Sequence, residues 1–329
     1  MGLMSREVAS SLLKNIFVSL SPRDIITFAF QGGEPSLAGL GFFYFFASEA
    51  EKLSPRNVEI NYTFQTNGML IDDDWCDFFI EKNVLVGLSL DGYLHDENRF
   101  DKTGEKTLSR VLEKKNMLDK RGVTYNILWV LTGKSSIQTN RVWDFIVREN
   151  LKYVQFVPCL EMISPSANRV DTLTPQKFYR FYAALFQQWK REVKNGNIIN
   201  IRLFDDLANL YMTKQHIACG ISGRCTPQIV VEANGNVYPC DFYAMDEYLV
   251  GNICTNSIEE IYNMIVSSTF ISKNQRLHKW CDDCKYNMWC HGGCRRMFLA
   301  VYDEPCGMRM FLDKCINDLI RIATGIYRT

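Results

Sequence analysis

The fold of this chain is decided by the stretch "IITFAFQGGEP" at residues 25–35, which joins a short apolar run to a glycine turn. Nearly continuous apolar runs of this length are typical of strands that are buried on both faces, as in a parallel sheet. Similar runs recur at 58–64, 84–90, 123–131 and 153–160, and amphipathic stretches at 40–53, 73–82, 106–121 and 138–149 separate them. This alternation predicts an α/β fold in which helices connect parallel strands.

The array is incomplete in a specific way. The five predicted strands are too few for a familiar closed barrel, and the chain opens directly on a helix-like segment. A βα array that begins with a helix predicts that the first strand is missing.

The second half of the chain has a different pattern, in which a long helix precedes short, cysteine-rich segments. Thr174 and Pro175 read as the cap and first residue of a long helix that stops at Gly196. From about residue 215 the segments become short, and ten of the twelve cysteines fall between Cys219 and Cys315. We therefore predict a partial barrel at 1–165, a helical bridge at 166–213 and a cysteine-rich domain at 214–329.

Composition excludes several classes of function. Lys+Arg and Asp+Glu are equal at 37 each, so no overall charge attracts nucleic acid or an anionic membrane. No apolar run approaches the roughly 18 residues of a membrane span, and the N-terminus does not read as a signal peptide. We expect a cytoplasmic protein without nucleic-acid or membrane partners, in which stable disulfides are rare. The cysteines then need another explanation, such as a metal centre.

Polar motifs follow three of the predicted strands, where active sites of parallel barrels lie. They are "FQGGEP" with Gly33 and Glu34, "FQTNG" with Thr66 and Asn67, and "LSLDG…HDENR" with Ser89, Asp91 and Arg99. Each motif by itself could be an ordinary turn or a solvated surface loop. Their recurrence at successive strand ends favours a pocket for a small polar molecule.

The cysteine spacings favour a metal cage. They read Cys219-x5-Cys225-x14-Cys240, then "CDDCKYNMWCHGGCRR" at 281–296, followed by Cys306 and Cys315. Iron–sulfur clusters take four thiolates at loose spacings, whereas zinc favours paired Cys-x2-Cys knuckles, with His278 or His291 as possible additional ligands. Inert buried thiols are the third reading, and we assign the isolated Cys76, Cys159 and Cys254 to it.

Taken together, "FAFQGGEPSLAGL", "QTNGMLID", "GLSLDG", "YPCDFYAMDEY", "GNI" and the cysteine run resemble the anaerobic sulfatase-maturating enzymes over almost the whole chain. These are radical S-adenosylmethionine (SAM) enzymes with a SPASM domain. The resemblance implies a partial (βα)6 radical SAM barrel that binds SAM, followed by a loop-rich domain with two auxiliary 4Fe–4S clusters.

The resemblance also implies roles for individual residues. Gly33, Glu34, Ser89, Arg99 and Leu160 would contact SAM, with Glu34 on its methionyl ammonium and Leu160 near its adenine. One auxiliary cluster would be bound by Cys219, Cys225, Cys240 and Cys294. The other would be bound by Cys281, Cys284, Cys290 and a late cysteine, for which Cys315 is predicted over Cys306 because it is expected just before the final helix.

In the family, Asp241 looks like the general base. A 5′-deoxyadenosyl radical would take a hydrogen from Cβ of a cysteine or serine in a sulfatase polypeptide, and Asp241 would take the thiol or hydroxyl proton. An auxiliary cluster would accept the remaining electron, and the residue would become formylglycine. The implied partners are that sulfatase polypeptide and a reducing donor such as flavodoxin or ferredoxin.

The chain departs from the family in one respect. No cysteine precedes Cys76, so the C-x3-C-x2-C loop of the SAM-cleaving cluster is absent. We therefore expect a truncated enzyme that does not cleave SAM by itself. The alternatives are another SPASM-type enzyme that modifies peptides and a non-catalytic iron–sulfur or zinc-binding module.

Overall fold

The computed structural model describes residues 2–161, 163, 171–272 and 278–325. Within them the chain forms two compact units that are interleaved along the sequence. The first contains 1–88, 110–125 and 226–273, and the second contains 89–109, 126–225 and 274–329. Each unit therefore holds parts of the predicted barrel and of the predicted cysteine-rich domain.

The six strands of the large sheet run in the order β1-β2-β3-β4-β5-β6. The pairings that are described within it, β1 with β2, β2 with β3, β4 with β5 and β5 with β6, are all parallel. The strands are β1 (Ile25–Phe30), β2 (Glu59–Thr66), β3 (Leu85–Ser89), β4 (Tyr125–Leu131), β5 (Tyr153–Pro158) and β6 (Asn200–Ile201). All five predicted strands and the parallel α/β class are confirmed, and the two-residue β6 is an addition.

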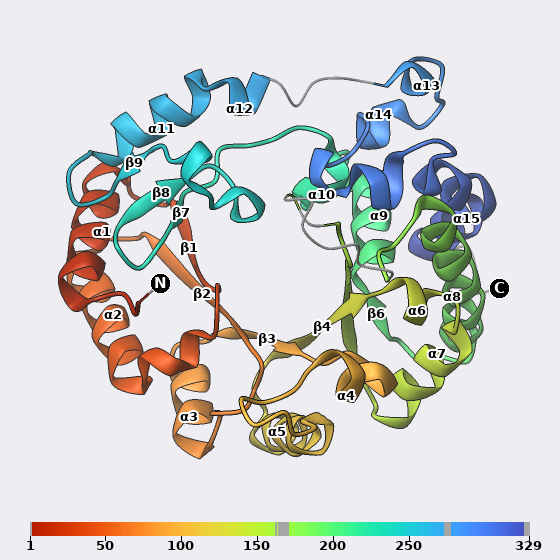
Figure 1. The fold of residues 1–329 in the computed structure, drawn as a ribbon, viewed down its shortest axis with the longest axis horizontal. Coiled ribbons are helices and arrows are strands. Elements are labelled where there is room, and N and C mark those ends of the chain that lie inside the picture. The colour runs from red at the N-terminus through yellow and green to blue at the C-terminus, as the bar shows by residue number, and fades with distance from the viewer. Residues whose placement is uncertain (1, 162, 164–170, 273–277, 326–329) are drawn as a thin grey trace. The chain divides into compact units, whose positions relative to one another are not determined.

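Aromatic packing holds the helices of the first unit to its strands. The helices packed in this way are α1 (Arg6–Ser19), α2 (Leu40–Leu53) and α3 (Asp73–Glu81) (Figure 1). Most of α5 (Leu108–Arg121), which contains no aromatic residue, also belongs to this unit. Phe30 meets Phe43 and Phe46 of α2 edge to face, with ring centroids 5.0 and 5.1 Å apart. Phe64 lies 5.2 Å from the Trp75 ring of α3. Because alternate strand residues point to opposite faces, the other face of β1 and β2 carries smaller or polar residues such as Thr27 and Thr63.

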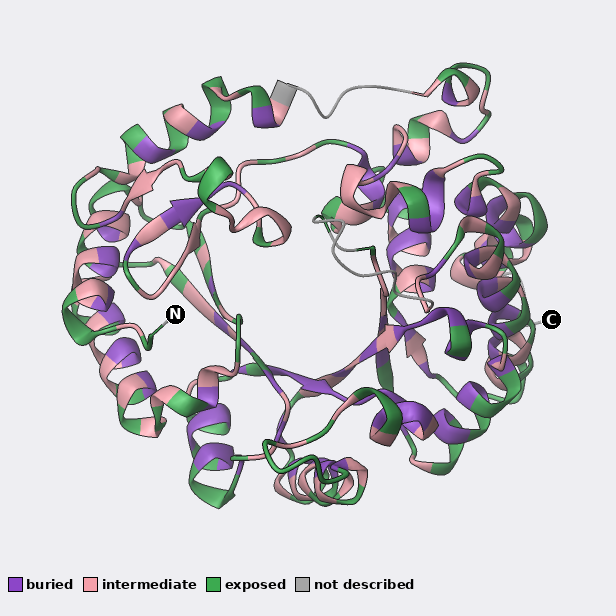
Figure 2. Cartoon of the chain, in the orientation of Figure 1, coloured by how far each residue is buried: buried purple, intermediate pink, exposed green. Residues whose placement is uncertain are grey.

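The edge strand β1 is less buried than its apolar sequence predicts. It pairs with β2 alone among the described strands, and Ile25 is 65% exposed. The prediction that this strand is buried on both faces is therefore wrong, because Ile25, Thr27 and Ala29, on the face opposite the α2 contacts, are all exposed. Figure 2 shows the contrast with the largely buried β3.

The second unit is organised around one aromatic core. Trp129 of β4 contacts Phe145 of α7 (Thr139–Arg148) and Phe156 of β5. Phe204 of α9 (Arg202–Thr213) stacks on Phe311 of α15 (Gly307–Ala323) at 5.9 Å. The predicted long helix is confirmed as α8 (Pro175–Lys194), and the Thr174 side chain accepts a hydrogen bond from the Lys177 amide as its N-cap.

The remaining elements are short, as the sequence predicts for the cysteine-rich part. In the first unit they are η1 (Pro35–Ala38), β7 (Val230–Val231), β8 (Asn236–Tyr238), η3 (Asp241–Tyr243), η4 (Asp246–Tyr248), β9 (Gly251–Asn252), α11 (Ile258–Ser267) and α12 (Thr269–Ser272). In the second unit they are η2 (Gly92–Leu94), α4 (His95–Asn98), α6 (Gly133–Ser136), α10 (Cys219–Ser222), α13 (Lys279–Asp282), α14 (Asn287–Cys290), η6 (Arg295–Met297) and η7 (Phe298–Tyr302).

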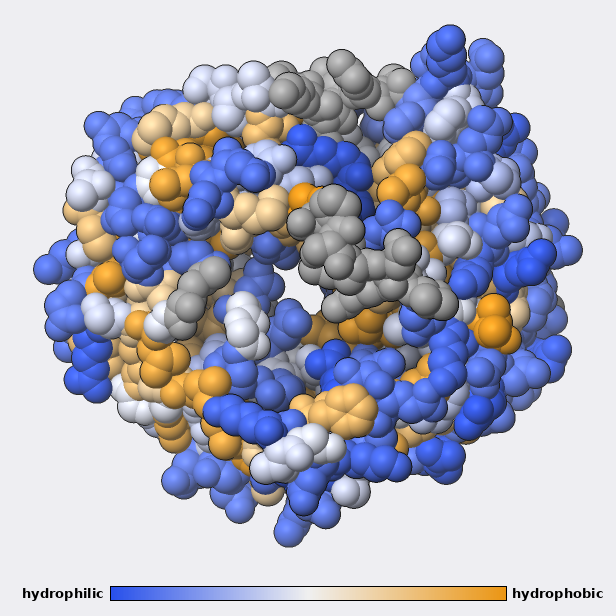
Figure 3. Space-filling model, in the orientation of Figure 1, coloured by the Kyte–Doolittle hydropathy of each residue, from blue (hydrophilic) through white to orange (hydrophobic). Residues whose placement is uncertain are grey.

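The surface is mixed in character. Figure 3 shows hydrophilic residues over much of one face, with smaller hydrophobic groups between them. Over the described ranges, none of the helices combines the length and the apolar character that a bilayer crossing requires.

Candidate cofactor sites

The glycine turn after β1 holds Glu34 in a dense hydrogen-bond network within the first unit. Its Oε1 accepts from the Ser36 amide at 3.1 Å, the Ser36 hydroxyl at 2.7 Å and the Thr66 hydroxyl at 2.8 Å. Its Oε2 accepts from the Asn67 amide at 2.7 Å. Two of the three predicted motifs thus meet at one carboxylate, and Oε2 keeps a lone pair that could accept from an ammonium group. The Thr66 hydroxyl thus bonds to Glu34, whereas the sequence suggested that it contacts the ligand directly.

The third motif builds a second polar network, which lies in the second unit. Asp91 is 2% exposed and its Oδ1 accepts from the Val130 amide at 2.8 Å. The Nε of Arg99 donates to Asp91 Oδ2 at 2.8 Å, so the carboxylate fixes the guanidinium at its stem. Gly92 is required between them, because it has a φ of +57° and any Cβ would lie 1.8 Å from the Trp129 ring.

His95 holds this loop through both nitrogens of its ring. It is 1% exposed, and its Nδ1 accepts from the Asp91 amide at 3.2 Å while Nε2 lies 3.0 Å from the Thr107 hydroxyl. Burial lowers the pKa of His95 to about 4, with Arg99 acting in the same direction and Asp91 and Asp96 opposing it. His95 is therefore a neutral ring at physiological pH, which suits its role as an acceptor at Nδ1.

Arg99 lines an open cavity of about 440 Å³ in the second unit. The lining residues are Asp91, Asn98, Arg99, Val130, Thr132, Cys159 and Asp171. Thr132 is not among the predicted site residues and Cys159 is predicted in the core, although they directly follow strands β4 and β5. The strand-end rule that found Glu34 would have found them too. Of the other predicted SAM contacts in this unit, Ser89 is buried at 6% exposure and Leu160 is half-buried, and neither belongs to the cavity lining.

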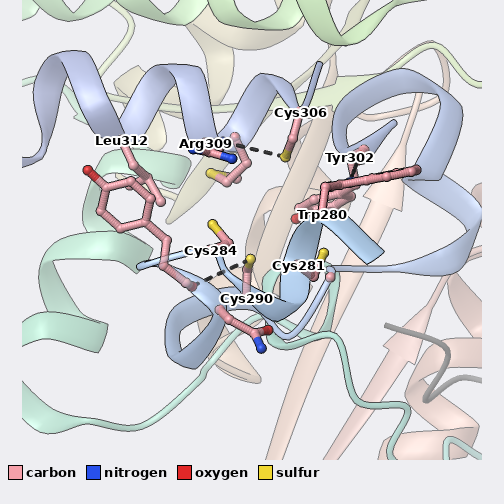
Figure 4. Close-up of a pocket in the computed structure, with 12 residues that line it drawn as sticks. Trp280, Cys281, Cys284, Cys290, Tyr302, Cys306, Arg309 and Leu312 are labelled. Carbon is pink, nitrogen blue, oxygen red and sulfur yellow. Dashed lines mark hydrogen bonds between the residues drawn. The ribbon is translucent and has the colours of Figure 1, made fainter. Parts of the chain in front are cut away.

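Four cysteines of the second unit line one small pocket, which Figure 4 shows with their sulfur atoms turned toward a shared space. They are Cys281 in α13, Cys284, Cys290 in α14 and Cys306 at the N-cap of α15. Burial raises the pKa of Cys290 to about 12, and the thiols of Cys306, Cys281 and Cys284 act in the same direction. Buried thiols that disfavour one another's ionisation are the environment that a bound cation would stabilise.

The structure places Cys306, rather than the predicted Cys315, beside the other three cysteines of this pocket. Cys306 lines this pocket, and its Sγ accepts from the Arg309 amide at 3.5 Å. Cys315 lies two turns further along α15, is 1% exposed and is not part of the lining. Because the final helix begins at Gly307, Cys315 is an interior helical residue whose side chain is buried in the core.

A second group of thiols gathers where α10 meets the turn after α14. The Cys294 amide donates to the Gly220 carbonyl at 3.1 Å, which joins the Cys219 segment to the Cys294 turn. Burial raises the pKa of Cys225, Arg295 opposes this shift, and the Cys294 thiol adds to it. Cys219, Cys225 and Cys294 therefore belong to one neighbourhood of the second unit.

Cys240 and Asp241 lie in the first unit, just after β8. Asp241 is exposed, and its Oδ1 accepts from the Phe242 amide at 2.9 Å and from the Cys240 thiol at 3.4 Å. The carboxylate is thus oriented by its own turn and is open to solvent.

The other candidate ligands have structural contacts. His278 stacks on Trp280 and Phe298, and the His291 Nδ1 lies 3.0 Å from the Ser222 carbonyl oxygen. Cys76 is fully buried as predicted, whereas Cys254 is exposed and the core assignment for it is wrong. In the part of the chain that the structure describes, no three His, Cys, Asp or Glu side chains converge closely enough to bind a single metal ion.

Comparison with known proteins identifies the class first. Residues 219–285 match SPASM, described as an iron-sulfur cluster-binding domain. A solved structure titled native anSMEcpe with bound AdoMet and Cp18Cys peptide superposes with a TM-score of 0.91 at 35% identity, covering 99% of this chain and 92% of that one. The fold is therefore that of a radical SAM enzyme with a SPASM domain, as the resemblance implied.

Similar sequences then define the family. A cysteine-type anaerobic sulfatase-maturating enzyme of Clostridium perfringens is 37% identical over 99% of this chain and 90% of its own length. A serine-type anaerobic sulfatase-maturating enzyme of Klebsiella aerogenes is 31% identical over 88% and 72%. The chain belongs to the anaerobic sulfatase-maturating enzyme family, whose members are radical SAM enzymes.

Proposed function

We propose that this chain takes part in converting a cysteine or serine of a sulfatase polypeptide to formylglycine. Family membership supports the reaction class, and the cysteine-lined pocket of the second unit is the observation that carries the proposal. When bound, SAM and iron–sulfur clusters supply the hydrogen-abstracting oxidant and the electron acceptors of this chemistry. A reducing partner such as flavodoxin or ferredoxin is part of the proposal.

The polar networks at the strand ends would bind SAM. Glu34 would accept from the methionyl ammonium at Oε2, beside the exposed Gly33, where the backbone is open to a ligand. Arg99 would pair with the carboxylate of the ligand while Asp91 holds its stem. Ser89 and Leu160 remain proposed contacts, and the cavity adds Thr132 and Asn98.

The thiols would hold two 4Fe–4S clusters. Cys281, Cys284, Cys290 and Cys306 would bind one, because they line one pocket. Cys219, Cys225 and Cys294 would bind the other, with Cys240 as its fourth ligand by resemblance. A four-iron cluster spreads its thiolates more widely than a single tetrahedral ion does, so these loose groups fit it better than zinc.

Asp241 would accept the proton of the substrate. Its exposed carboxylate is anchored through Oδ1 by the Phe242 amide and can take the proton from the substrate thiol or hydroxyl. The proton transfer oxidises nothing, and it leaves the sulfur or oxygen of the substrate ready to form the double bond to Cβ. Serine would give the aldehyde directly, whereas cysteine would give a thioaldehyde that water hydrolyses, with the sulfur leaving as hydrogen sulfide.

The first test is metal content. After reconstitution with iron and sulfide without oxygen, the chain is expected to bind about eight irons, the number in two four-iron clusters. Stoichiometric zinc without iron uptake would instead support a structural metal module. Zinc and iron are counted together by mass spectrometry in one sample.

The second test addresses the substrate. The chain, joined to a C-x3-C-x2-C segment from a relative, is incubated with SAM, reductant and a short sulfatase peptide that carries cysteine or serine. Formylglycine on either peptide supports the proposal, and Asp241→Asn is expected to lower its yield at least about 100-fold. SAM cleavage without any change in either peptide would indicate a different polypeptide substrate.

A further inference from the structure

Tyr302 is not among the residues that the sequence predicts for a site, and the role argued for it below rests on the two proposed clusters. Tyr302 ends η7, is 3% exposed and lines the pocket of Cys281, Cys284, Cys290 and Cys306. Figure 4 shows its ring beside Trp280 at the edge of that pocket. A tyrosine that is buried this deeply needs a hydrogen-bond partner for its hydroxyl.

The hydroxyl of Tyr302 has its hydrogen-bond partner in the segment that carries Cys219. Tyr302 Oη donates to the Gly220 carbonyl oxygen at 3.0 Å, and the Cys294 amide donates to the same oxygen at 3.1 Å. Gly220 directly follows Cys219. One carbonyl therefore ties the Cys219 segment, the Cys294 turn and Tyr302 together.

The ring occupies space that a glycine leaves free. Gly293 has a φ of +68°, and a Cβ there would lie 2.0 Å from the Tyr302 ring. His291, Gly292 and Gly293 all have positive φ, so the turn between Cys290 and Cys294 is left-handed throughout. This turn is where the chain passes from a ligand of one proposed cluster to a ligand of the other.

The backbone of Tyr302 is held as well. Trp280 Nε1 donates to its carbonyl oxygen at 3.3 Å, and Trp280 precedes Cys281. The carbonyl oxygen and the hydroxyl of Tyr302 are therefore both hydrogen-bonded to segments that carry proposed ligands.

We propose that Tyr302 is a positioning residue shared by the two cluster sites, whose ring fixes the Cys290–Cys294 turn and whose hydroxyl fixes the Cys219 segment to it. The ligands of the two clusters are thereby held in register by one side chain. Loss of the ring is expected to impair loading at both sites, and loss of the hydroxyl alone is expected to loosen the site that includes Cys219 and Cys294.

The test compares Tyr302→Leu with Tyr182→Leu. Tyr182 is a matched control, because it is 4% exposed in the same unit but packs among Phe178, Phe181 and Phe204. After identical reconstitution, Tyr302→Leu is expected to retain about four irons or fewer, and Tyr182→Leu about eight. Gly293→Ala is expected to behave like Tyr302→Leu, because its Cβ takes the place of the ring.

Tyr302→Phe separates positioning from general stability. It keeps the ring, so about eight irons and a nearly unchanged unfolding temperature are expected. An iron chelator should nevertheless remove half of the iron about fivefold faster than from the unmodified chain, the factor that one net hydrogen bond supplies. Biphasic chelation, with only one phase accelerated, would identify the affected cluster.

Three outcomes overturn the inference. Tyr302→Leu with about eight irons and an unchanged chelation rate would show that neither site needs the ring. Equal iron loss in Tyr182→Leu would show that any core defect has this effect. If Cys219→Ala and Cys306→Ala themselves leave the iron content unchanged, the cluster assignment fails, and that result is distinct from failure of Tyr302 alone.

Discussion

The Glu34 turn of the first unit and the cysteine pocket of the second unit solve the problem of buried polar groups in opposite ways. Glu34 receives four hydrogen bonds from its own chain, so its carboxylate is oriented before any ligand binds. The thiols of Cys281, Cys284, Cys290 and Cys306 face one another, and burial raises the pKa of Cys281, Cys290 and Cys306. The first site is preorganised by hydrogen bonds, whereas the thiols of the second are groups that a bound cation would stabilise.

The largest effect is expected from removing a thiol of the pocket. Cys306→Ala should lower the iron content from about eight to about four per chain, because the cluster proposed for this pocket is held by its four thiolates and would lose one of them. Cys315→Ala is the matched control, since it removes a thiol from the same helix outside the pocket. Iron loss in Cys315→Ala but not in Cys306→Ala would reverse the assignment.

The next largest effect concerns His95 and pH. The pKa in the folded chain, about 4, lies below the ordinary 6.5, so the unfolded chain binds the proton first as the pH falls. The contribution of His95 to the free energy of unfolding is therefore complete above pH 6.5. As the pH falls toward 4 this contribution is lost, which lowers the free energy of unfolding by on the order of 3 kcal/mol. His95→Gln should remove this part of the pH dependence, measured by urea unfolding between pH 4 and 7.5.

If the unmodified chain and His95→Gln lose stability in parallel over that range, His95 is not the group that titrates. Asp91, Arg99 and Asp96 surround the ring and are unchanged in the variant, so the difference between the two curves isolates the imidazole.

A smaller effect tests preorganisation at Glu34. Glu34→Ala should lower the free energy of unfolding of the metal-free chain by about 2 kcal/mol, because four donors lose their acceptor. The iron content after reconstitution should not change. Glu49→Ala, which removes an exposed ion pair with Lys52, should cost at most about 0.5 kcal/mol. An equal cost for the two variants would mean that the Glu34 network is not preorganised.

The smallest effect extends the comparison to another hydrogen-bonded clip in the first unit. Asn15 of α1 donates to the carbonyl oxygens of Ile253 and Asn256 and accepts from the Ile258 amide. Asn15→Ala should cost about 1–2 kcal/mol in thermal or urea unfolding, with full iron loading. Reduced iron in this variant would show that the cluster sites depend on the fold of the first unit.

Much of the architecture followed from local patterns. The apolar runs predicted β1 to β5 within a few residues, and Thr174, Pro175 and Gly196 predicted the limits of α8, because caps and strand periodicity are local properties. The strand-end rule also indicated Glu34 and Arg99. Thr132 and Cys159 lie at the ends of β4 and β5 and satisfy the same rule, but they are not among the predicted site residues.

The cysteine assignments show where local reasoning ends. The spacing of Cys281, Cys284, Cys290 and Cys294 indicated a metal centre, but spacing does not say which thiols face the same space. That depends on where α15 begins, since Cys306 at its N-cap turns into the pocket and Cys315, within the helix, turns into the core.

The sequence by itself determined the α/β class, the long helix and the metal-binding character of the last hundred residues, because periodicity, capping and thiol density act over short distances. Only the tertiary structure decided that Thr66 and Asn67 orient Glu34, that Cys306 joins the pocket, and that Tyr302 lines this pocket while bonding to the Gly220 carbonyl. Those contacts join residues far apart along the chain, and their geometry depends on how whole elements pack rather than on any one segment.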